Sequence, residues 1–377
     1  PDPPCFGSMT MNRPVSRIAG AAMLALCVLS SPGWARMKTE ATGAAVQPTG
    51  RTDFLRHPHD SKYYTESWTM ILQSDEGHVL YVNFMYSNIG VTSGRSAVSV
   101  NLTMPGGQGK PYGWEYDQKD YREDFDGNSL AIGPHSLSLQ GRTATFRVEG
   151  SELRLHGRLR GWTDGVKFHG GRICLDDGCE DFVQSFFHVP RGDFEGDLSV
   201  GGQRVRLKGA GYLDHMVNTE MSSKWSSHWW TVRYFHKDHT VALLAFRPRK
   251  DYGSAPILRL LVTDRNRVLA LTDRFTLETD QEARDPSKKG HSYATRYRIE
   301  AKFPRGTIQG TFTGRRVHER DAVLERLPWA QRTIAQAVAG NPVIYRQEGT
   351  PDLVLVLEDG TEVPLTEGTA LMESIVN

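Results

Sequence analysis

The sequence lacks an excess of charge of either sign. Its 45 basic and 44 acidic residues leave a net charge of +1 over 377 residues. Without a basic patch or run there is no electrostatic basis for binding nucleic acid or an anionic membrane surface. We therefore expect no nucleic-acid partner and at most transient contact with membranes.

Long apolar runs are also missing. The longest, residues 18–29, is shorter than the roughly 20 residues that span a bilayer. It follows two arginines and is followed by the small-x-small pattern Gly33-Trp34-Ala35, which is typical of a secretory signal peptide cleaved after Ala35. We therefore predict a signal peptide over residues 11–35 and an exported, periplasmic or secreted protein. Residues 1–10 are expected to be upstream or cloning-derived sequence, and residues 36–60 a linker.

Familiar cofactor and catalytic motifs are absent from the sequence. It has no Gly-x-Ser-x-Gly elbow, phosphate loop or dinucleotide fingerprint. The histidine-rich stretches at residues 57–60 and 236–239 have no flanking Cys or Glu at metal-ligand spacing. The sequence therefore predicts neither a cofactor nor a metal site.

Cysteine is scarce, with four in the chain, and signal cleavage would leave only Cys174 and Cys179. They flank the Asp-Asp-Gly turn of "CLDDGC". An exported protein would form a disulfide across such a loop. A closed zinc site is the alternative, but it requires a second pair of ligands. We predict the Cys174–Cys179 disulfide.

What the sequence does contain is a long series of short strand patterns. The 37 glycines and 10% aromatic content suit a turn-rich β protein. Hairpin signals recur at residues 75–77, 201–202, 237–238 and 264–266. Regular short strands with tight turns predict an all-β sandwich or antiparallel barrel. Two successive strand series predict two similar β domains, over residues 61–205 and 206–377.

One segment has helical periodicity. Residues 320–339 place Val323, Leu324, Leu327, Ile334 and Val338 on one face, before Gly340-Asn341-Pro342. We therefore expect one helix near the C-terminus.

Residues 207–235 combine strand alternation with three Trp, two His and two Tyr. Alternation puts Tyr212 and Asp214 on one face and His215 on the other. Asp214 beside an aromatic wall is a candidate proton donor with a raised pKa. The alternative is that Asp214 and His215 satisfy buried polar groups where two barrels meet.

The second half of this stretch is a candidate pocket lining. If Trp230 points inward, His228 shares its face, whereas Trp229 and Arg233 point outward. Ordinary barrel core with a surface arginine remains open as the alternative. The candidate ligand-binding residues are Tyr212, Trp225, His228, Trp230 and Tyr234; the candidate catalytic residues, if the protein is an enzyme, are Tyr212, Asp214 and His215.

Several of these stretches resemble a known family. "LYVNFMYSNIG" resembles the entry strand of the fungal survival-factor proteins, which are tandem lipocalin-like proteins. "GAGYLDH" resembles a stretch of the carotenoid 1,2-hydratases, and "KWSSHWWTVRYF", "RKDYGSAPILRLLVTDRNRVLALTD" and "EGTALMESI" resemble segments shared by both groups. The resemblance implies two lipocalin-like (calycin) antiparallel barrels packed together and a long apolar ligand.

The family includes lipid binders, hydratases that add water to isoprenoids, fungal Diels–Alderases and, more remotely, tocopherol cyclase. In the hydratases the Asp-His pair is followed closely by Asn-Trp-Gly, but Met216-Val217-Asn218-Thr219 follows it here. We therefore favour a non-catalytic carrier of a lipid, ceramide-like or isoprenoid ligand. The alternative is a cofactor-free hydratase, cyclase or isomerase with Asp214 as proton donor.

Overall fold

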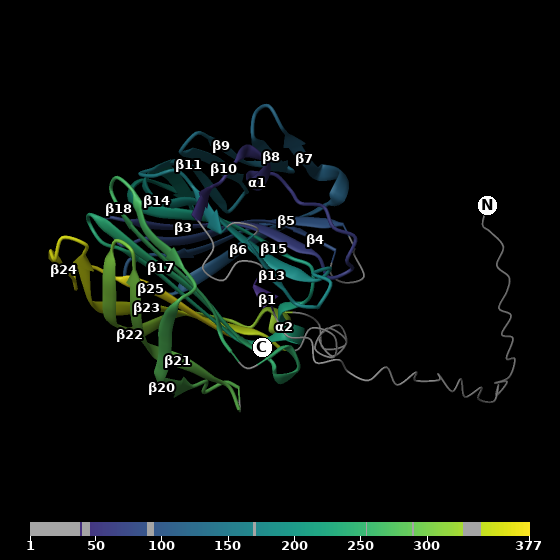
Figure 1. Cartoon of the computed structure of the whole chain (residues 1–377). Helices are drawn as coiled ribbons and strands as arrows, with labels where there is room; N and C mark the ends of the chain where they lie inside the picture. The colour runs from purple at the N-terminus through teal and green to yellow at the C-terminus, as the bar shows by residue number, and fades with distance from the viewer. Residues whose placement is uncertain are drawn as a thin grey trace, which may run out of the picture. The chain divides into compact units, whose positions relative to one another are not determined.

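The computed structural model describes residues 38–39, 46–88, 94–168, 171–253, 255–288, 290–326 and 341–377. The predicted signal peptide lies outside these residues. The described residues belong to one compact unit, Trp34–Asn377. They form two curled antiparallel sheets with very little helix (Figure 1). The all-β prediction is therefore confirmed.

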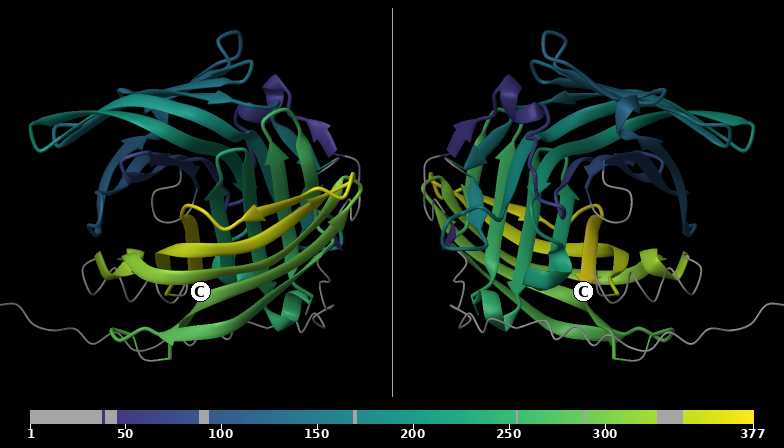
Figure 2. Two further views of the ribbon diagram at one scale, coloured as in Figure 1. Left: turned by 90° about the vertical axis from the view of Figure 1, so that its left-hand side faces the viewer. Right: turned by 90° about the vertical axis from the view of Figure 1, so that its right-hand side faces the viewer.

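The first sheet curls into a near-barrel, drawn in purple to teal (Figures 1 and 2). Its main path runs, in spatial order, through β6 (Gly109–Asp117), β5 (Arg95–Thr103), β4 (Val79–Ser87), β3 (Thr65–Ser74), β15 (Gln203–Asn218), β14 (Phe182–Val200), β11 (Leu153–Gly161), β10 (Thr143–Glu149), β9 (His135–Gln140), β8 (Ser129–Ile132) and β7 (Tyr121–Asp124). Four short strands are attached beside it: β1 (Lys38–Thr39), β2 (Val46–Pro48), β12 (Val166–Phe168) and β13 (Arg172–Cys174).

The second sheet, drawn in green to yellow, is a half-barrel. Its path runs through β19 (Val268–Thr272), β18 (Ile257–Asp264), β17 (His239–Pro248), β16 (Ser226–Phe235), β25 (Ala370–Val376), β23 (Val343–Leu357), β22 (Gly306–Asp321), β21 (Ser292–Phe303) and β20 (Phe275–Arg284), and β24 (Glu362–Leu365) pairs with β23.

Two of the predicted hairpins form where glycine permits the turn. β3 and β4 pair across the Asp75-Glu76-Gly77 turn, and Gly77 has φ of +92°. β14 and β15 pair across Gly201-Gly202, with φ of +57° and +79°. Residues other than glycine rarely adopt these left-handed backbone conformations. The local sequence therefore specifies both turns.

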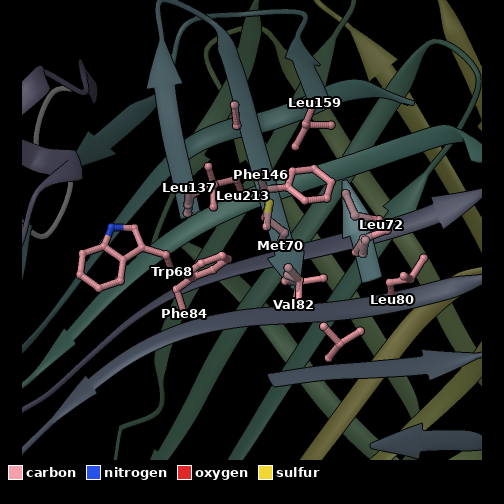
Figure 3. Close-up of a cluster of buried hydrophobic side chains, with 14 of the residues drawn as sticks. Trp68, Met70, Leu72, Leu80, Val82, Phe84, Leu137, Phe146, Leu159 and Leu213 are labelled. Carbon is pink, nitrogen blue, oxygen red and sulfur yellow. The ribbon is translucent and has the colours of Figure 1, made fainter. Parts of the chain in front are cut away.

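The first near-barrel encloses a packed core. Alternate residues of β3 and β4 point inward, including Trp68, Met70, Val82 and Phe84, and each is fully buried. Phe146 from β10 meets them from the opposite wall (Figure 3). Period-two alternation thus fills the interior with side chains, as in other small barrels.

A polar contact joins β6, one end of the first sheet, to β9, which lies near the other end. The Tyr116 hydroxyl on β6 lies 2.8 Å from His135 Nε2 on β9, and the Glu149 N–H donates to His135 Nδ1 at 3.0 Å. Because Nδ1 accepts a hydrogen bond, Nε2 carries the proton and donates to Tyr116. Burial lowers the pKa of His135 to about 4, which matches this neutral ring.

The two sheets pack back to back through residues that face away from both cores. Phe187 and Tyr212 of the first sheet contact Ala242 and Leu261 of the second. Ile71 and Tyr81 of the first sheet likewise contact Leu371 of the second. The junction is therefore an apolar layer that also buries polar side chains of β15 and β16.

The chain passes from the first sheet to the second between Asn218 and Ser226, where it forms helix α2 (Ser222–Trp225). The pattern instead predicted a domain boundary at 205/206, which falls inside β15. Nothing local marks the change, because the strand alternation continues through the whole of β15. The division into two domains therefore stays a prediction, with its boundary moved to the α2 segment.

The segment expected to be a linker is folded from residue 46 onward. β2 pairs with β12, and helix α1 (Arg51–Phe54) leads into Phe54 and Leu55, which are buried in the first core. The remainder of the expected linker, apart from β1, lies outside the described residues. Its Thr, Ala, Gly and Pro content gave no sign of these tertiary contacts.

The expected C-terminal helix is wrong at its start. Arg320 and Asp321 pair with β23 as the end of β22. A short 3-10 helix, η3 (Val323–Arg326), follows, and residues 327–340 lie outside the described part of the chain. Ladder pairing and the Arg320–Asp285 ion pair of 2.8 Å hold this end of β22 extended. The remaining 3-10 turns are η1 (Gln118–Asp120) and η2 (Lys250–Tyr252).

Across the described residues, no helix is both long and apolar enough to cross a membrane.

Candidate functional site

The polar residues of β15 separate onto two faces, as alternation predicts. Tyr212 and Asp214 face the second sheet, whereas His215 faces the interior side of the first. The sequence-predicted catalytic trio is therefore divided between two environments. Asp214 and His215 do not converge on one reacting centre.

Asp214 pairs with Arg233 of β16 across the sheet junction. Arg233 Nη2 lies 3.0 Å from Asp214 Oδ2, and the Tyr212 hydroxyl donates to the same oxygen at 2.8 Å. The Arg233 guanidinium also lies over the Tyr212 ring, 4.2 Å from its centroid. Its Nη1 donates to the carbonyls of Val232 and Leu243.

Burial sets the electrostatics of this trio. Asp214 and Arg233 are 7% and 3% exposed. Burial raises the pKa of Asp214 above its ordinary value, although Arg233 and the Tyr212 hydroxyl act in the opposite direction. Burial opposes the charge of Arg233, but Tyr212 and Asp214 raise its pKa overall. The expected surface arginine is thus a buried partner in an inter-sheet ion pair.

His215 takes part in a second polar cluster, which the sequence analysis missed. Its Nδ1 lies 2.8 Å from the Asp53 carbonyl oxygen, and its Nε2 lies 2.7 Å from Glu66 Oε1 on β3. The ring stacks on Trp68 with centroids 4.5 Å apart. His215 and Glu66 are both fully buried.

Glu66 accepts hydrogen bonds from several directions. The His57 backbone N–H lies 2.9 Å and 3.0 Å from its two oxygens, His57 Nδ1 lies 3.0 Å from Oε1, and the Tyr64 hydroxyl donates to Oε2. Burial disfavours the carboxylate, but the contacts with His215 and His57 outweigh burial and lower the pKa of Glu66 to about 2.

His57 belongs to the histidine-rich stretch at residues 57–60, which is visible in the sequence. Its carboxylate partner was hidden, because Glu66 reads as an ordinary polar residue of an alternating strand. Within the described residues, His57, Glu66 and His215 form the one group of three potential metal ligands whose donor atoms all lie within 4.8 Å of one another.

The candidate residues of the second sheet face its own core. Trp230 and Tyr234 are buried there, and His228 stacks on Trp230 with ring centroids 5.7 Å apart. Arg247 lies over Trp230 at 4.7 Å, and the Tyr234 hydroxyl donates to the Glu367 carbonyl. His228 and Trp230 therefore share a face, as the alternation predicts.

Trp225 is separated from these residues. It ends α2 and is fully buried beside Trp229 and Phe246, in a different cluster. The structure thus distributes the five candidate ligand-binding residues over the sheet junction, the second core and the α2 cluster.

A pocket that could hold a ligand lies elsewhere. It has a volume of about 540 Å³ and opens between β19, the turn after β21, and the short strands β2 and β12. Its apolar lining comes from Val46, Phe168, Val268, Leu269, Leu271 and Phe303. None of the candidate residues from the sequence lines it.

The lining of this pocket, the β19 pocket, also carries charge. Arg274, Lys302 and Arg305 contribute to it together with Asp273. One carboxylate oxygen of Asp273 is buried without a hydrogen-bond partner. The sequence contained no local signal for this pocket, because its walls come from segments more than 200 residues apart.

The disulfide predicted from spacing is confirmed. Cys174 and Cys179 are bonded, with Cα atoms 4.7 Å apart, and they close the loop between β13 and β14. Cys174 is buried. Such a bond suggests an oxidising compartment.

Comparisons with known proteins agree with the fold. The model of the Svf1 family matches residues 34–376. No curated protein sequence matches the chain. Among solved structures, the AttH-like protein of Nitrosomonas europaea is 12% identical with a TM-score of 0.59, covering 88% of this chain and 97% of its own. CghA, solved with Sch210972, is 9% identical with a TM-score of 0.57, covering 88% and 98%. At these identities the likeness shows the lipocalin-like fold alone.

Proposed function

The chain belongs to the Svf1 family, and from that membership and the geometry of the β19 pocket we propose that it binds and carries a long apolar ligand. The observation that carries the proposal is a pocket of about 540 Å³ with an apolar wall. Ligand pockets are typically about 300–1,000 Å³, mostly apolar and provided with a few polar groups. The packed interior of the first barrel favours this pocket over a lumen site.

The charges around the pocket suggest the ligand's head group. Arg274 and Lys302 are exposed and Arg305 is half-buried, so cations outnumber the single carboxylate of Asp273. An acyl or isoprenoid chain would lie on Phe168 and Leu271. An anionic head, carboxylate or phosphate, would meet the cations at the mouth.

The energetics are adequate for such a ligand. Each buried CH₂ contributes about 0.8 kcal/mol, so a chain of about 12 carbons supplies roughly 10 kcal/mol. Association costs of about 4 kcal/mol, the low end of the range, leave roughly 6 kcal/mol, which is a dissociation constant of some tens of micromolar.

Direct binding tests the proposal. The delipidated protein should bind a fluorescent polyene fatty acid with micromolar affinity. Val268→Trp, which fills the pocket, should weaken binding at least about tenfold. Val354→Trp is the matched control, since Val354 is a half-buried valine of β23 outside the pocket lining. If both variants bind like the wild type, the pocket assignment fails.

A second comparison tests the head group separately. Arg274→Gln combined with Lys302→Gln should weaken binding of the fatty acid and leave binding of its alcohol unchanged. Equal effects on acid and alcohol would reject the anionic head but leave the carrier proposal standing.

A cofactor-free hydratase, cyclase or isomerase is the second candidate. The raised pKa of Asp214 favours it, since a proton donor must retain its proton near neutral pH. The contact with Arg233 at 3.0 Å works against it by stabilising the ionised form. Turnover of an isoprenoid or polyene by the wild type, lost in Asp214→Asn, would favour the enzyme.

We also propose that the protein is exported. The signal pattern and the Cys174–Cys179 bond support this. The intact mass of protein recovered from the exported fraction should correspond to a chain that begins after Ala35. A mature chain that retains residues 11–35 would contradict the proposal.

A further inference from the structure

The buried cluster on the interior side of β15 has the donor set of a metal site. We propose that His57 Nδ1, the Glu66 carboxylate and His215 Nε2 bind one divalent first-row cation of the Zn²⁺ type. Their donor atoms already lie within 4.8 Å of one another. Two imidazoles and one carboxylate are a set that Zn²⁺ accepts in proteins. The proposal is independent of the ligand pocket.

The hydrogen bonds of His215 carry the argument furthest. Its Nδ1 lies 2.8 Å from the Asp53 carbonyl, which can only accept, so Nδ1 must carry a hydrogen. In a neutral ring, Nε2 would then direct its lone pair at Glu66 Oε1, 2.7 Å away. Two acceptors at this distance repel unless a positive species lies between them. That species is either a second proton or a metal ion.

A metal fits the pattern that ligating histidines follow. They typically donate the second ring N–H to a backbone carbonyl or a carboxylate, which fixes the tautomer and leaves the other nitrogen free to ligate. The His215–Asp53 contact is of this kind. The Tyr64 hydroxyl and the His57 backbone N–H orient Glu66 in the same way.

The two distances to Glu66 Oε1 require only a small expansion. Zn–N and Zn–O bonds of about 2.0–2.2 Å in a tetrahedral site put donor atoms roughly 3.4 Å apart. Oε1 of Glu66 now lies 3.0 Å from His57 Nδ1 and 2.7 Å from His215 Nε2. His57 can supply much of the movement, because it lies outside the sheets and its side chain is 30% exposed.

A buried histidine, His188, lies beside the group. His188 stacks on His215 with centroids 5.7 Å apart and is 2% exposed. Neither of its nitrogens meets hydrogen-bond geometry, although the Asp53 carbonyl is close enough to favour its protonation. Burial nevertheless lowers the pKa of His188 well below its ordinary value. His188 packs against the group but is not one of its three donors.

The bound cation would link two separate parts of the fold. His57 belongs to the N-terminal segment that covers the first barrel, whereas Glu66 and His215 belong to β3 and β15. A shared cation would tie this segment to the sheet. Because the unfolded chain has no preformed site, binding would stabilise the fold.

Metal analysis of the mature, untagged protein tests the proposal. After chelation, dialysis against Zn²⁺ should leave about one equivalent bound and raise the melting temperature. Co²⁺ should give the visible absorption of a site with nitrogen and oxygen ligands. His57→Ala should weaken Zn²⁺ binding at least about 100-fold. His59→Ala is the matched control, since His59 shares the same stretch but is not in the group.

His57 is chosen because it is half-buried, so its variant should fold; circular dichroism checks this. Three results would overturn the proposal. One is a wild type that retains no Zn²⁺ or Co²⁺. Another is a His57→Ala variant that binds like the wild type. The third is nitrogen NMR showing both His215 nitrogens protonated in the presence of Zn²⁺, which would identify an imidazolium–carboxylate pair instead.

Discussion

The ion pair between Asp214 and Arg233 gives the sharpest prediction about the sheet junction. Asp214→Asn preserves the shape of the side chain and removes its charge. Arg233 would remain 3% exposed with no carboxylate in hydrogen-bond contact, and its Nε already lacks a partner. The variant should therefore fold less stably, with the two sheets still in place.

The magnitude follows from the burial of the pair. Removing one partner from a buried ion pair costs about 3–5 kcal/mol. Asparagine can still accept from Tyr212 and Arg233, so we expect about 3 kcal/mol. Arg233→Met alone should cost a similar amount. Because each single change already removes the pair, the double variant should recover about 2 kcal/mol relative to the sum of the singles.

Urea denaturation followed by tryptophan fluorescence measures these free energies. Ligand affinity, measured by tryptophan quenching, should stay within about tenfold of the wild type in Asp214→Asn, since Asp214 does not line the β19 pocket. The reasoning is refuted if Asp214→Asn unfolds like the wild type. If it also binds ligand normally but no longer converts a polyene that the wild type converts, Asp214 is the proton donor of an enzyme.

Three further outcomes are expected. Trp230→Ala should lower the free energy of unfolding by about 3–5 kcal/mol, because it truncates a buried ring, and leave affinity within about threefold; a loss of 1–3 kcal/mol of binding energy would instead place the ligand against this strand. Cys174 and Cys179 should resist alkylation until reductant is added, and ready labelling of either thiol would argue against the bond in the exported protein. The pKa of His135 is lowered to about 4 from an ordinary 6.5, so the unfolded chain binds the proton more readily and stability should fall as pH drops from about 6.5 to 4. His135→Gln should lose less stability over that window, as measured by urea titration at pH 7.5 and 4.5, and an identical loss would show that His135 is not responsible.

Local features of the chain were predictable. The turn at Gly77 and the one at Gly201-Gly202 follow from glycine and short polar runs between alternating strands. The disulfide follows from two cysteines around a tight turn. Each depends on residues within a few positions of one another, so the sequence contains the relevant physics.

The separation of Asp214 from His215 was also predictable, but their partners were not. Strand geometry puts neighbours on opposite faces whatever the fold. Glu66 is 149 residues from His215, and Arg233 becomes a buried partner only because two sheets pack back to back. Similarly, the early part of the expected helix extends β22 because β23 offers a ladder.

By itself, the sequence determined the β class, the principal turns, the disulfide and the faces of each strand. All of these depend on backbone preference and the two-residue period of a strand. Only the tertiary structure decided where the sheets change, which polar groups are paired, and that a pocket forms between β19, the turn after β21, and β2 and β12. These features depend on contacts between segments that are distant in the sequence. The local alternation of a strand does not say which strand it pairs with, because any strand with the same two-residue period would fit it equally well.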